Sequence, residues 1–485
     1  MEFYIYDLIF LVLFCAFIAI FLYRNRKKLK REMKIAFLYK TKLGLKLINY
    51  IGGKYKKLLN SLKYIIIFTS YFLMAGICIL LGKSLFLYIR YPILITKLIK
   101  APPIAPLIPY FPKLFQMESF FPHFYFTYFI LALAIVAIVH ELSHGIFMKH
   151  NKVRIKSTGI VFFGPILGAF VEQNEKDMTK LSKTNQMTIL GAGVFANVIT
   201  GIFFFLIWAG IFFITFAPAG ANFNDYAQSI IKIDSINQIN NFTIDNKTNE
   251  GIINFLDSDK IKDSSLINEK NNSLKSLRIF ANDLYYFSNI EILKTQLQQD
   301  VEYLVLYEDF PAINLELKGN IIEFDHNKIQ TYNDLEKIIK NYSPGEKINL
   351  KTKNGENILE YNLTLVSNLR NPEKALIGIS NQEIKTNIAE NLAFFKEKFT
   401  YYESRGKFLE FLYYLVFWIF LINLLVALFN MLPLSILDGG RFFYLTILGI
   451  TKKEKISKKI YKSLGFLILF LFLLAMAGWV FGILH

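Results

Sequence analysis

The chain has 485 residues, of which 53% are hydrophobic and 16% aromatic, and its formal net charge at pH 7 is +17. This composition is too apolar for an ordinary soluble protein and predicts a membrane protein. Residues 217–400 carry 20 Lys and Arg against 26 Asp and Glu, a net of −6, so the remaining +23 lies beside the apolar stretches. Such basic runs are typical of membrane topology signals. We therefore expect no nucleic-acid partner.

Apolar stretches long enough to cross a hydrocarbon core of roughly 30 Å occur six times. The predicted spans are residues 3–23, 64–84, 124–148, 186–216, 409–431 and 461–483. The basic residues gather in 24–63, 149–156, 176–183 and 452–462. The positive-inside rule places these four segments in the cytoplasm, and the two termini and residues 217–400 outside. We expect a polytopic α-helical protein with about six transmembrane helices in the lipid bilayer of the cell membrane.

The first predicted element is a transmembrane anchor over residues 1–23. A basic run, RNRKKLKR, follows it without a small-residue cleavage site, so we expect a retained anchor and not a signal peptide. Residues 24–63 mix Lys and Arg with Ile, Leu and Tyr, which is typical of a basic amphipathic helix on the cytoplasmic membrane surface. A solvated connector is the alternative. Residues 64–123 then supply the second transmembrane helix and a proline-rich outer loop.

The most informative motif is HELSH, near the end of the third predicted span in the segment 124–216. His140 and His144 are four residues apart, so on a helix their imidazoles share one face and can bind one zinc ion. Glu141 is rotated by about 100° from His140. Its carboxylate can therefore reach a water at the metal without replacing it, as a general base requires. Ionisable groups in an apolar span are usually functional, although two core histidines paired with Glu141 are the alternative.

A catalytic zinc ion needs a third protein ligand. Asp438 is the better candidate, because it is the single acid of the apolar segment FLINLLVALFNMLPLSILDGGRFF and lies near the cytoplasmic side, as His140 does. Glu172 and Glu175, in a polar stretch that follows an apolar one, are alternative loop ligands. A purely structural alternative is that Asp438 caps a helix before a diglycine turn.

The polar block 217–400 shows local signals in its second half. Thr331 with Asp334 three residues later forms a capping box, which predicts a short amphipathic helix. Two alternating runs around Asn354-Gly355 predict a β-hairpin. With FPAINLELKGNIIEFD before them, residues 300–366 resemble a PDZ domain of membrane proteases. We therefore expect an inserted extracytoplasmic PDZ-like α/β domain, whereas residues 217–299 carry no recognisable motif.

Four motifs together resemble the site-2 protease family of intramembrane metalloproteases. They are HELSH at 140–144, GPILGAFVEQNE at 164–175, GAGVFANV at 191–198 and NMLPLSILDGG at 430–440. The resemblance covers about 120–216 and 408–450. It implies that His140, His144 and Asp438 bind zinc and that Glu141 activates the water.

The resemblance also implies residues that contact substrate. Asn430 stands at the family's asparagine eight residues before the aspartate, where it would orient substrate or stabilise the oxyanion. An interhelical hydrogen bond is the alternative for Asn430. Asn197 occupies another family position, with a packing or a substrate role, although Val194 replaces the common proline.

The segment STGIVFFGPILGAFV at 157–171, which contains Gly164 and Gly168, looks like the family's membrane-embedded β-hairpin. Its exposed edge could pair with an extended substrate backbone. A re-entrant loop is the alternative.

The predicted function is a zinc endopeptidase that hydrolyses a peptide bond within or near a transmembrane helix of a membrane-anchored protein substrate, near the cytoplasmic face. Residues 124–216 and 408–450 would form the catalytic core, and residues 451–485 a basic cytoplasmic loop and the last transmembrane helix. The outer domain would exclude substrates with bulky outer domains. A transporter or a non-catalytic scaffold is the alternative class, but neither requires HExxH, and a scaffold has no use for Glu141.

Overall fold

The computed structural model describes residues 2–32, 36–92, 96, 102, 107–164, 166–258, 274–368, 371–381 and 387–484. The chain divides into two compact units. The helical unit comprises Met1–Thr215, Thr386–Ala393 and Gly406–His485, and the inserted unit comprises Phe216–Lys385 and Phe394–Arg405. The inserted unit thus occupies two stretches of the sequence, which are separated by the short segment Thr386–Ala393 of the helical unit.

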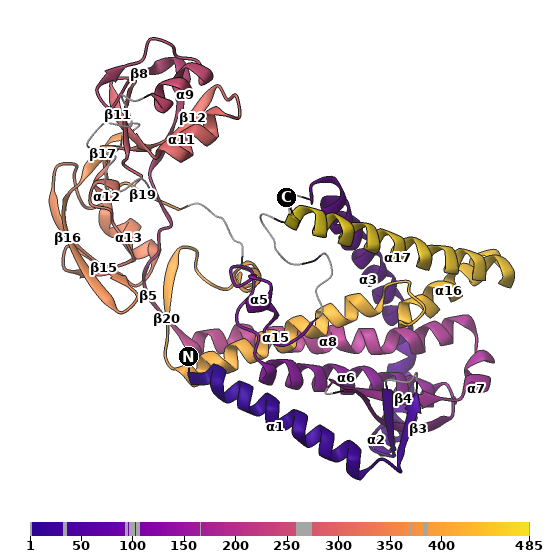
Figure 1. Cartoon of the computed structure of the whole chain (residues 1–485). Coiled ribbons are helices and arrows are strands. Elements are labelled where there is room, and N and C mark those ends of the chain that lie inside the picture. Colours follow the sequence, from indigo (N-terminus) through magenta and orange to yellow (C-terminus); the bar gives the residue numbers. More distant parts are fainter. Residues whose placement is uncertain are drawn as a thin grey trace. The chain divides into compact units, whose positions relative to one another are not determined.

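Among the described residues, six helices of the helical unit are long and apolar enough to cross a membrane (Figure 1). They are α1 (Glu2–Arg24), α3 (Lys56–Arg90), α6 (Phe126–His150), α8 (Lys183–Thr215), α15 (Lys407–Asn430) and α17 (Glu454–Leu484). Each coincides with a predicted span to within a few residues or contains it. The prediction of about six transmembrane helices is confirmed by length and composition.

Shorter elements of the helical unit connect these spans. They are α2 (Leu45–Lys54), α5 (Phe111–Leu114), α7 (Glu175–Thr179), α14 (Ile388–Leu392) and α16 (Asp438–Thr451).

The start of α6 is held by an acid from α1. Asp7 is 2% exposed, and its carboxylate accepts hydrogen bonds from the backbone N–H groups of Phe126 at 2.7 Å and Thr127 at 2.9 Å. The first N–H groups of a helix have no partner within the helix. Asp7 supplies that partner from a neighbouring helix and so ties α1 to the helix that carries HELSH.

A four-stranded antiparallel sheet lies beside α6 in the helical unit (Figure 1). Its strands, in order, are β1 (Leu29–Glu32), β2 (Ala36–Thr41), β3 (Ile155–Phe163) and β4 (Ile166–Gln173). The β-hairpin expected within residues 157–171 is confirmed, and β4 is its edge strand. The depth of the hairpin in the membrane stays a prediction.

The amphipathic helix expected over residues 24–63 is wrong for its first half. A helix forms at α2, but residues 29–32 and 36–41 contribute strands β1 and β2 to the sheet. Along Ala36–Tyr39 the side chains alternate between buried and half-buried, which suits a strand with one covered face. The edge of β3 provides the hydrogen-bond partners for this strand, and such long-range pairing is invisible in a local pattern.

After α15, the chain turns through residues 431–437 and enters α16 at Asp438. Gly439 and Gly440 lie within this helix, so the alternative of a diglycine turn after a capping aspartate is wrong. A Cβ on Gly439 would lie 2.4 Å from the carbonyl oxygen of Met431, and a Cβ on Gly440 would lie 2.0 Å from that of Leu434. The two glycines therefore let the first turn of α16 approach the preceding backbone closely, which places Asp438.

The inserted unit contains two six-stranded sheets. The first has the order β7 (Gln228–Lys232), β12 (Tyr303–Glu308), β11 (Leu284–Ser288), β10 (Leu277–Ala281), β8 (Ile236–Ile239) and β9 (Phe242–Thr243). The second has the order β16 (Asn357–Thr364), β15 (Lys347–Asn354), β13 (Asn320–Phe324), β5 (Phe216–Ala221) and β20 (Thr400–Ser404), with β14 (Asn327–Lys328) beside β13.

Helices and short strands complete the inserted unit. They are η1 (Ile233–Ser235), α9 (Asn249–Asp257), α11 (Ile290–Leu297), α12 (Pro311–Asn314), α13 (Tyr332–Ile339), β6 (Asp225–Tyr226), β17 (Val366–Asn368), β18 (Asn371–Leu376) and β19 (Ile379–Ser380).

Two local predictions within residues 300–366 are confirmed. The hydroxyl of Thr331 accepts from the N–H of Asp334 at 3.1 Å, and the Asp334 carboxylate accepts from the N–H of Thr331 at 2.9 Å, which completes the capping box of α13. Strands β15 and β16 form the expected hairpin, with Asn354 opposite Asn357 and Gly355 at a φ of 62°. The PDZ-like character of the whole segment stays a prediction.

The two sheets of the inserted unit share one motif. In the order β8-β9-α9-β10-β11, β8 pairs with β9 and β10, and β10 pairs with β11. In the order β13-β14-α13-β15-β16, β13 pairs with β14 and β15, and β15 pairs with β16. Both first turns place two residues at positive φ, Asn240-Asn241 and Asp325-His326, and a threonine caps each helix. Within the described residues, 236–257 and 277–288 thus repeat the pattern of residues 320–364.

Candidate metal centre

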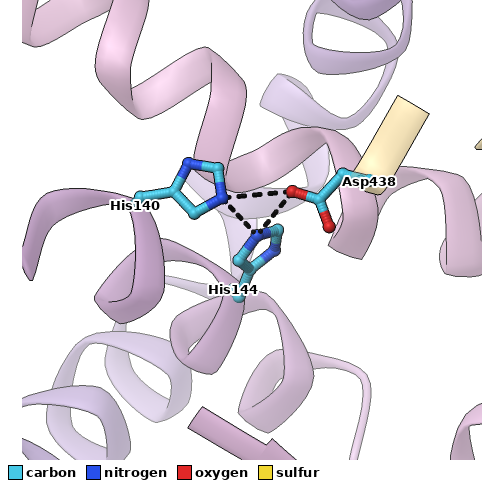
Figure 2. Close-up of side chains that lie close together, drawn as sticks. All are labelled: His140, His144 and Asp438. Carbon is cyan, nitrogen blue, oxygen red and sulfur yellow. Dashed lines mark hydrogen bonds and ion pairs between the residues drawn. The ribbon is translucent and has the colours of Figure 1, made fainter. Parts of the chain in front are cut away.

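His140 and His144 lie one turn apart on α6 and are both buried, with 8% and 6% of their surface exposed. Their Nε2 atoms are 3.0 Å apart. Asp438, the first residue of α16, brings its Oδ2 to 3.1 Å from Nε2 of His140 and to 3.2 Å from Nε2 of His144 (Figure 2). Among the described residues, this is the one group of three possible metal ligands, and its ligand atoms all lie within 4.8 Å of one another.

The chemistry of these three side chains fits a zinc ion. Nδ1 of His144 lies 2.7 Å from the carbonyl oxygen of Ile189, which can only accept, so Nδ1 carries the proton and Nε2 presents a lone pair. That lone pair faces the Asp438 carboxylate, and two acceptors at this distance repel unless a cation or a proton lies between them. Two ligands about 2.1 Å from a tetrahedral zinc ion are roughly 3.4 Å apart, close to the separations seen here.

Asn197 of α8 contacts the other histidine. Its side-chain Nδ2 lies 3.2 Å from Nδ1 of His140, the residue is 0% exposed, and within the described structure its Oδ1 has no hydrogen-bond partner. Rotation of the amide by 180° would let Oδ1 accept a proton from Nδ1 of His140. His140, like His144, would then present the lone pair of Nε2 toward Asp438.

These contacts come from one face of α8, where Ile189, Gly193 and Asn197 are spaced by four residues. A Cβ on Gly193 would lie 2.6 Å from Nε2 of His144 and 2.7 Å from Cε1 of His140, so only glycine leaves room for both rings. The sequence interpretation named Asn197 but missed Gly193 and Ile189. The helical spacing of four residues back from Asn197 could have identified Gly193 within GAGVFANV and Ile189 just before it.

Glu141 does not join the cluster of ligand atoms. Its Oε2 accepts a hydrogen bond of 2.9 Å from the backbone N–H of Val171 in β4. The carboxylate adjacent to the first histidine is therefore connected to the edge strand of the sheet.

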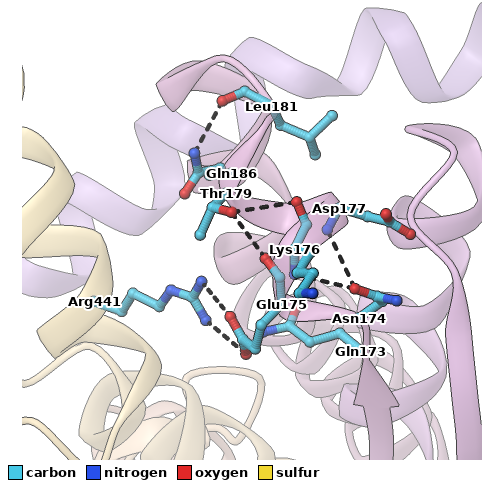
Figure 3. Close-up of polar contacts among 9 residues, drawn as sticks. All are labelled: Gln173, Asn174, Glu175, Lys176, Asp177, Thr179, Leu181, Gln186 and Arg441. Atoms are coloured by element: carbon cyan, nitrogen blue, oxygen red, sulfur yellow. Dashed lines mark hydrogen bonds and ion pairs between the residues drawn. The ribbon is translucent and has the colours of Figure 1, made fainter.

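The alternative ligands Glu172 and Glu175 are engaged elsewhere. Glu172 accepts from Nζ of Lys40 at 2.5 Å and from Oγ of Ser157 at 2.6 Å, and these hydrogen bonds hold the pKa of its carboxyl below the usual value. Glu175 binds Nη2 of Arg441 at 3.1 Å and so joins α7 to α16 (Figure 3). This geometry favours Asp438 as the third ligand.

The other residues expected at the site lie around it. Asn430 is the last residue of α15 and is half-buried. Gly164 is exposed at the β3–β4 turn with a φ of 60°, and Gly168 lies in β4 opposite Val161. Within the described structure, none of these three residues forms a hydrogen bond with the ligand side chains. Their roles toward substrate stay predictions.

Six apolar helices, one of which carries two histidines and an adjacent glutamate close to an aspartate on the short helix α16, are features of a membrane metallopeptidase. The chain matches the family model of peptidase family M50 over residues 128–476, a range that contains all four of these residues. The chain therefore belongs to peptidase family M50, the site-2 protease family of membrane zinc metalloproteases.

A curated relative from Methanocaldococcus jannaschii is 45% identical over 71 residues, which are 14% of this chain and 19% of the relative. The chain thus aligns with about a fifth of that protein, which is described as uncharacterized. The similarity supports kinship but supplies no substrate.

Proposed function

We propose that this protein is an intramembrane zinc endopeptidase that hydrolyses a peptide bond within or near a transmembrane helix of membrane-anchored protein substrates. The observation that carries this proposal is the convergence of His140, His144 and Asp438 beside Glu141, in a chain of family M50. Two of these side chains come from α6 and are brought to Asp438 by packing between segments nearly 300 residues apart.

His140 Nε2, His144 Nε2 and Asp438 Oδ2 would hold the zinc ion. When bound, the ion supplies a Lewis acid that polarises the peptide carbonyl and lowers the pKa of a water molecule. Glu141 removes a proton from the attacking water and delivers it to the leaving amine. Its position outside the ligand cluster suits this role, because a base that held the metal could not move protons.

The edge of β4 is the surface that we assign to the substrate backbone. Inside the membrane, the backbone N–H and C=O groups of a helical substrate are hydrogen-bonded to one another, so the helix has to unwind before cleavage. The extended segment then needs new partners, which the outer edge of β4 can provide by strand addition. Because the N–H of Val171 on β4 already donates to Glu141, a strand paired here would pass beside the base.

Asn430 is assigned to substrate orientation or to the oxyanion. An uncharged amide donor can stabilise negative charge on the carbonyl oxygen without repelling the metal. Its position at the end of α15, eight residues before Asp438, supports this assignment.

The inserted unit is proposed to act as a size filter on the outer side of the membrane. The basic segments that flank the spans support this orientation, with both termini outside and the metal centre near the cytoplasmic face. Replacement of residues 223–380 by a short flexible linker should raise cleavage of substrates with a large outer domain. Unchanged selectivity would count against the filter.

The central test is cleavage of a model transmembrane peptide by the purified chain, with zinc content measured on the same samples. Glu141→Gln should retain its zinc and lose at least about 100-fold in rate, because only the proton transfer is removed. His140→Ala should lose both. Cleavage by Glu141→Gln at the parental rate would show that the proposed mechanism is wrong.

A further inference from the structure

A half-open cavity of about 560 Å³ lies where α2, the start of α3, the end of α6 and the start of β3 meet. None of the candidate metal ligands lines it. The basic residues that line it are Lys56, Lys149, Lys152 and Arg154, and no acidic residue does. The cavity is therefore strongly positive and independent of the metal centre.

One of the four cations is already neutralised. The guanidinium of Arg154 donates to both carboxylate oxygens of Asp177, at 2.7 Å and 2.9 Å. These bonds lower the pKa of Asp177 to about 2, so the pair stays charged at any physiological pH. By contrast, Lys56, Lys149 and Lys152 form no ion pair within the described part of the chain. Three uncompensated ammonium groups around one cavity repel one another, and an anion between them removes that repulsion.

The position of the cavity indicates where such an anion comes from. Lys56 is the first residue of the span α3, and His150, which also lines the cavity, is the last residue of the span α6. His150 follows the apolar stretch of α6 almost directly, and Lys56 precedes by eight residues the apolar stretch of α3 that begins at residue 64. Both therefore lie on the side where the hydrocarbon core gives way to the layer of phosphate headgroups. Basic pockets between transmembrane helices at this level bind anionic lipid headgroups.

The walls of the cavity are held by close helix packing. A Cβ on Gly145 of α6 would lie 2.6 Å from Cδ1 of Ile48, and a Cβ on Gly52 would lie 2.8 Å from the carbonyl oxygen of Ile146. These two contacts press α2 against α6. Gly53 is the next residue and also lines the cavity, but a Cβ placed on it would meet nothing within 4 Å, so the space beside it is open.

We propose that this basic cavity binds the phosphate ester in the headgroup of an anionic phospholipid. Lys56, Lys149 and Lys152 supply the charge, and Arg154 stays with Asp177. The lysines also lie near the negative ends of α2 and α6, where cations stabilise a helix. If the lysines served only to stabilise the helix ends, the cavity would bind no anion. Helix stabilisation and headgroup binding therefore predict different results in a binding experiment.

The test is a titration of the purified full-length chain with short-chain phosphatidylglycerol, followed by native mass spectrometry, with short-chain phosphatidylcholine as the zwitterionic comparison. The variant Lys56→Gln/Lys149→Gln/Lys152→Gln should bind phosphatidylglycerol about 100-fold more weakly, at roughly fivefold for each lysine. The matched control Lys27→Gln/Lys28→Gln/Lys30→Gln removes the same charge from another basic segment outside the cavity. It should stay within about threefold of the parent.

A second variant separates binding from folding. Gly53→Leu keeps every charge and favours the helix, but its side chain would occupy the open space, so it should weaken phosphatidylglycerol binding at least tenfold. Equal binding by the parent, the lysine variant and Gly53→Leu would overturn the proposal.

In a third experiment, glycerol 1-phosphate and inorganic phosphate compete with phosphatidylglycerol for the cavity. Selective binding of phosphatidylglycerol supports a lipid headgroup as the source. If either soluble phosphate competes at equal concentration and loses affinity in the lysine variant, the cavity is a phosphate site but the lipid assignment is overturned.

Discussion

The side-chain amide of Asn197 lies 3.2 Å from Nδ1 of His140, on the ring nitrogen opposite the one that faces Asp438. A histidine that binds a metal through Nε2 carries its proton on Nδ1, and a partner that accepts this proton orients the ring. His144 has the same arrangement, with the carbonyl of Ile189 as its acceptor. Helix α8 thus contacts the Nδ1 side of both histidines through Asn197 and Ile189, and at Gly193 it also approaches Nε2 of His144 closely.

Replacement of Asn197 should therefore change zinc affinity more than fold stability. Asn197→Leu removes the acceptor and should weaken zinc binding by about 10- to 100-fold. Asn197→Asp retains an oxygen that accepts from Nδ1 of His140, and its affinity should stay within several-fold of the parent. Competition with a zinc chelator measures both values. Parental zinc affinity in Asn197→Leu would show that Asn197 has a packing or substrate role instead.

Gly193 permits a direct test of the space around the two histidines. Gly193→Ala would place its Cβ 2.6 Å from Nε2 of His144, so the ring or α8 has to move, and zinc affinity and cleavage should fall at least tenfold. Gly210→Ala is the matched control, because it lies in the same helix and its Cβ meets nothing within 4 Å. The control should keep full zinc binding and gain up to about 1 kcal/mol of helix stability. Equal behaviour of the two variants would contradict the close approach.

The spans and the histidine pair could be predicted because both depend on local patterns. Hydrophobic length determines a transmembrane helix, and a spacing of four residues places His140 and His144 on one face. Asp438 could be predicted as a ligand because it is the single acid of an apolar segment. The same reasoning could not give its distance from the histidines, since this depends on the glycine contacts at the start of α16.

Prediction from the sequence failed where strands pair over long distances. Residues 36–41 look amphipathic and basic, but they pair with β3, more than 100 residues away. The repeated motif in residues 236–257 and 277–288 was also missed. Its two copies share turn conformations and strand pairings, whereas few of their residues coincide, and the pairings exist only in the folded unit.

The assignment of the third ligand predicts opposite results for two acids. Asp438→Ala should lose zinc and activity together, because only two ligands remain. Glu172→Ala should retain its zinc, since its carboxylate contacts Lys40 and Ser157. Zinc content per chain, measured after dialysis against a weak chelator, distinguishes the two variants. Retained zinc in Asp438→Ala with loss in Glu172→Ala would show that Glu172 is the ligand.

The ion pair between Glu175 and Arg441 predicts a pH-dependent effect on the helix that carries Asp438. Partial burial pushes the pKa of Glu175 up, but hydrogen bonds from Gln173 and Arg441 outweigh this and hold it below its usual value of 4.5. The contribution of the pair is therefore complete above pH 4.5 and is lost as the pH falls through the lowered pKa of the folded state. Both side chains are partly exposed, so the contribution is at most about 1 kcal/mol.

Arg441→Gln should accordingly unfold at a lower temperature than the parent at pH 7, and the difference should shrink as the pH falls below 4.5. Thermal unfolding in detergent at pH 3.5 to 7, roughly one unit below to well above that value, measures this. Glu175→Gln should show the same profile, and the double variant should lose no more than either single variant, because the two groups act as one pair. A difference that stays constant with pH would mean that Arg441 stabilises α16 through packing of its side chain and not through the charge of Glu175.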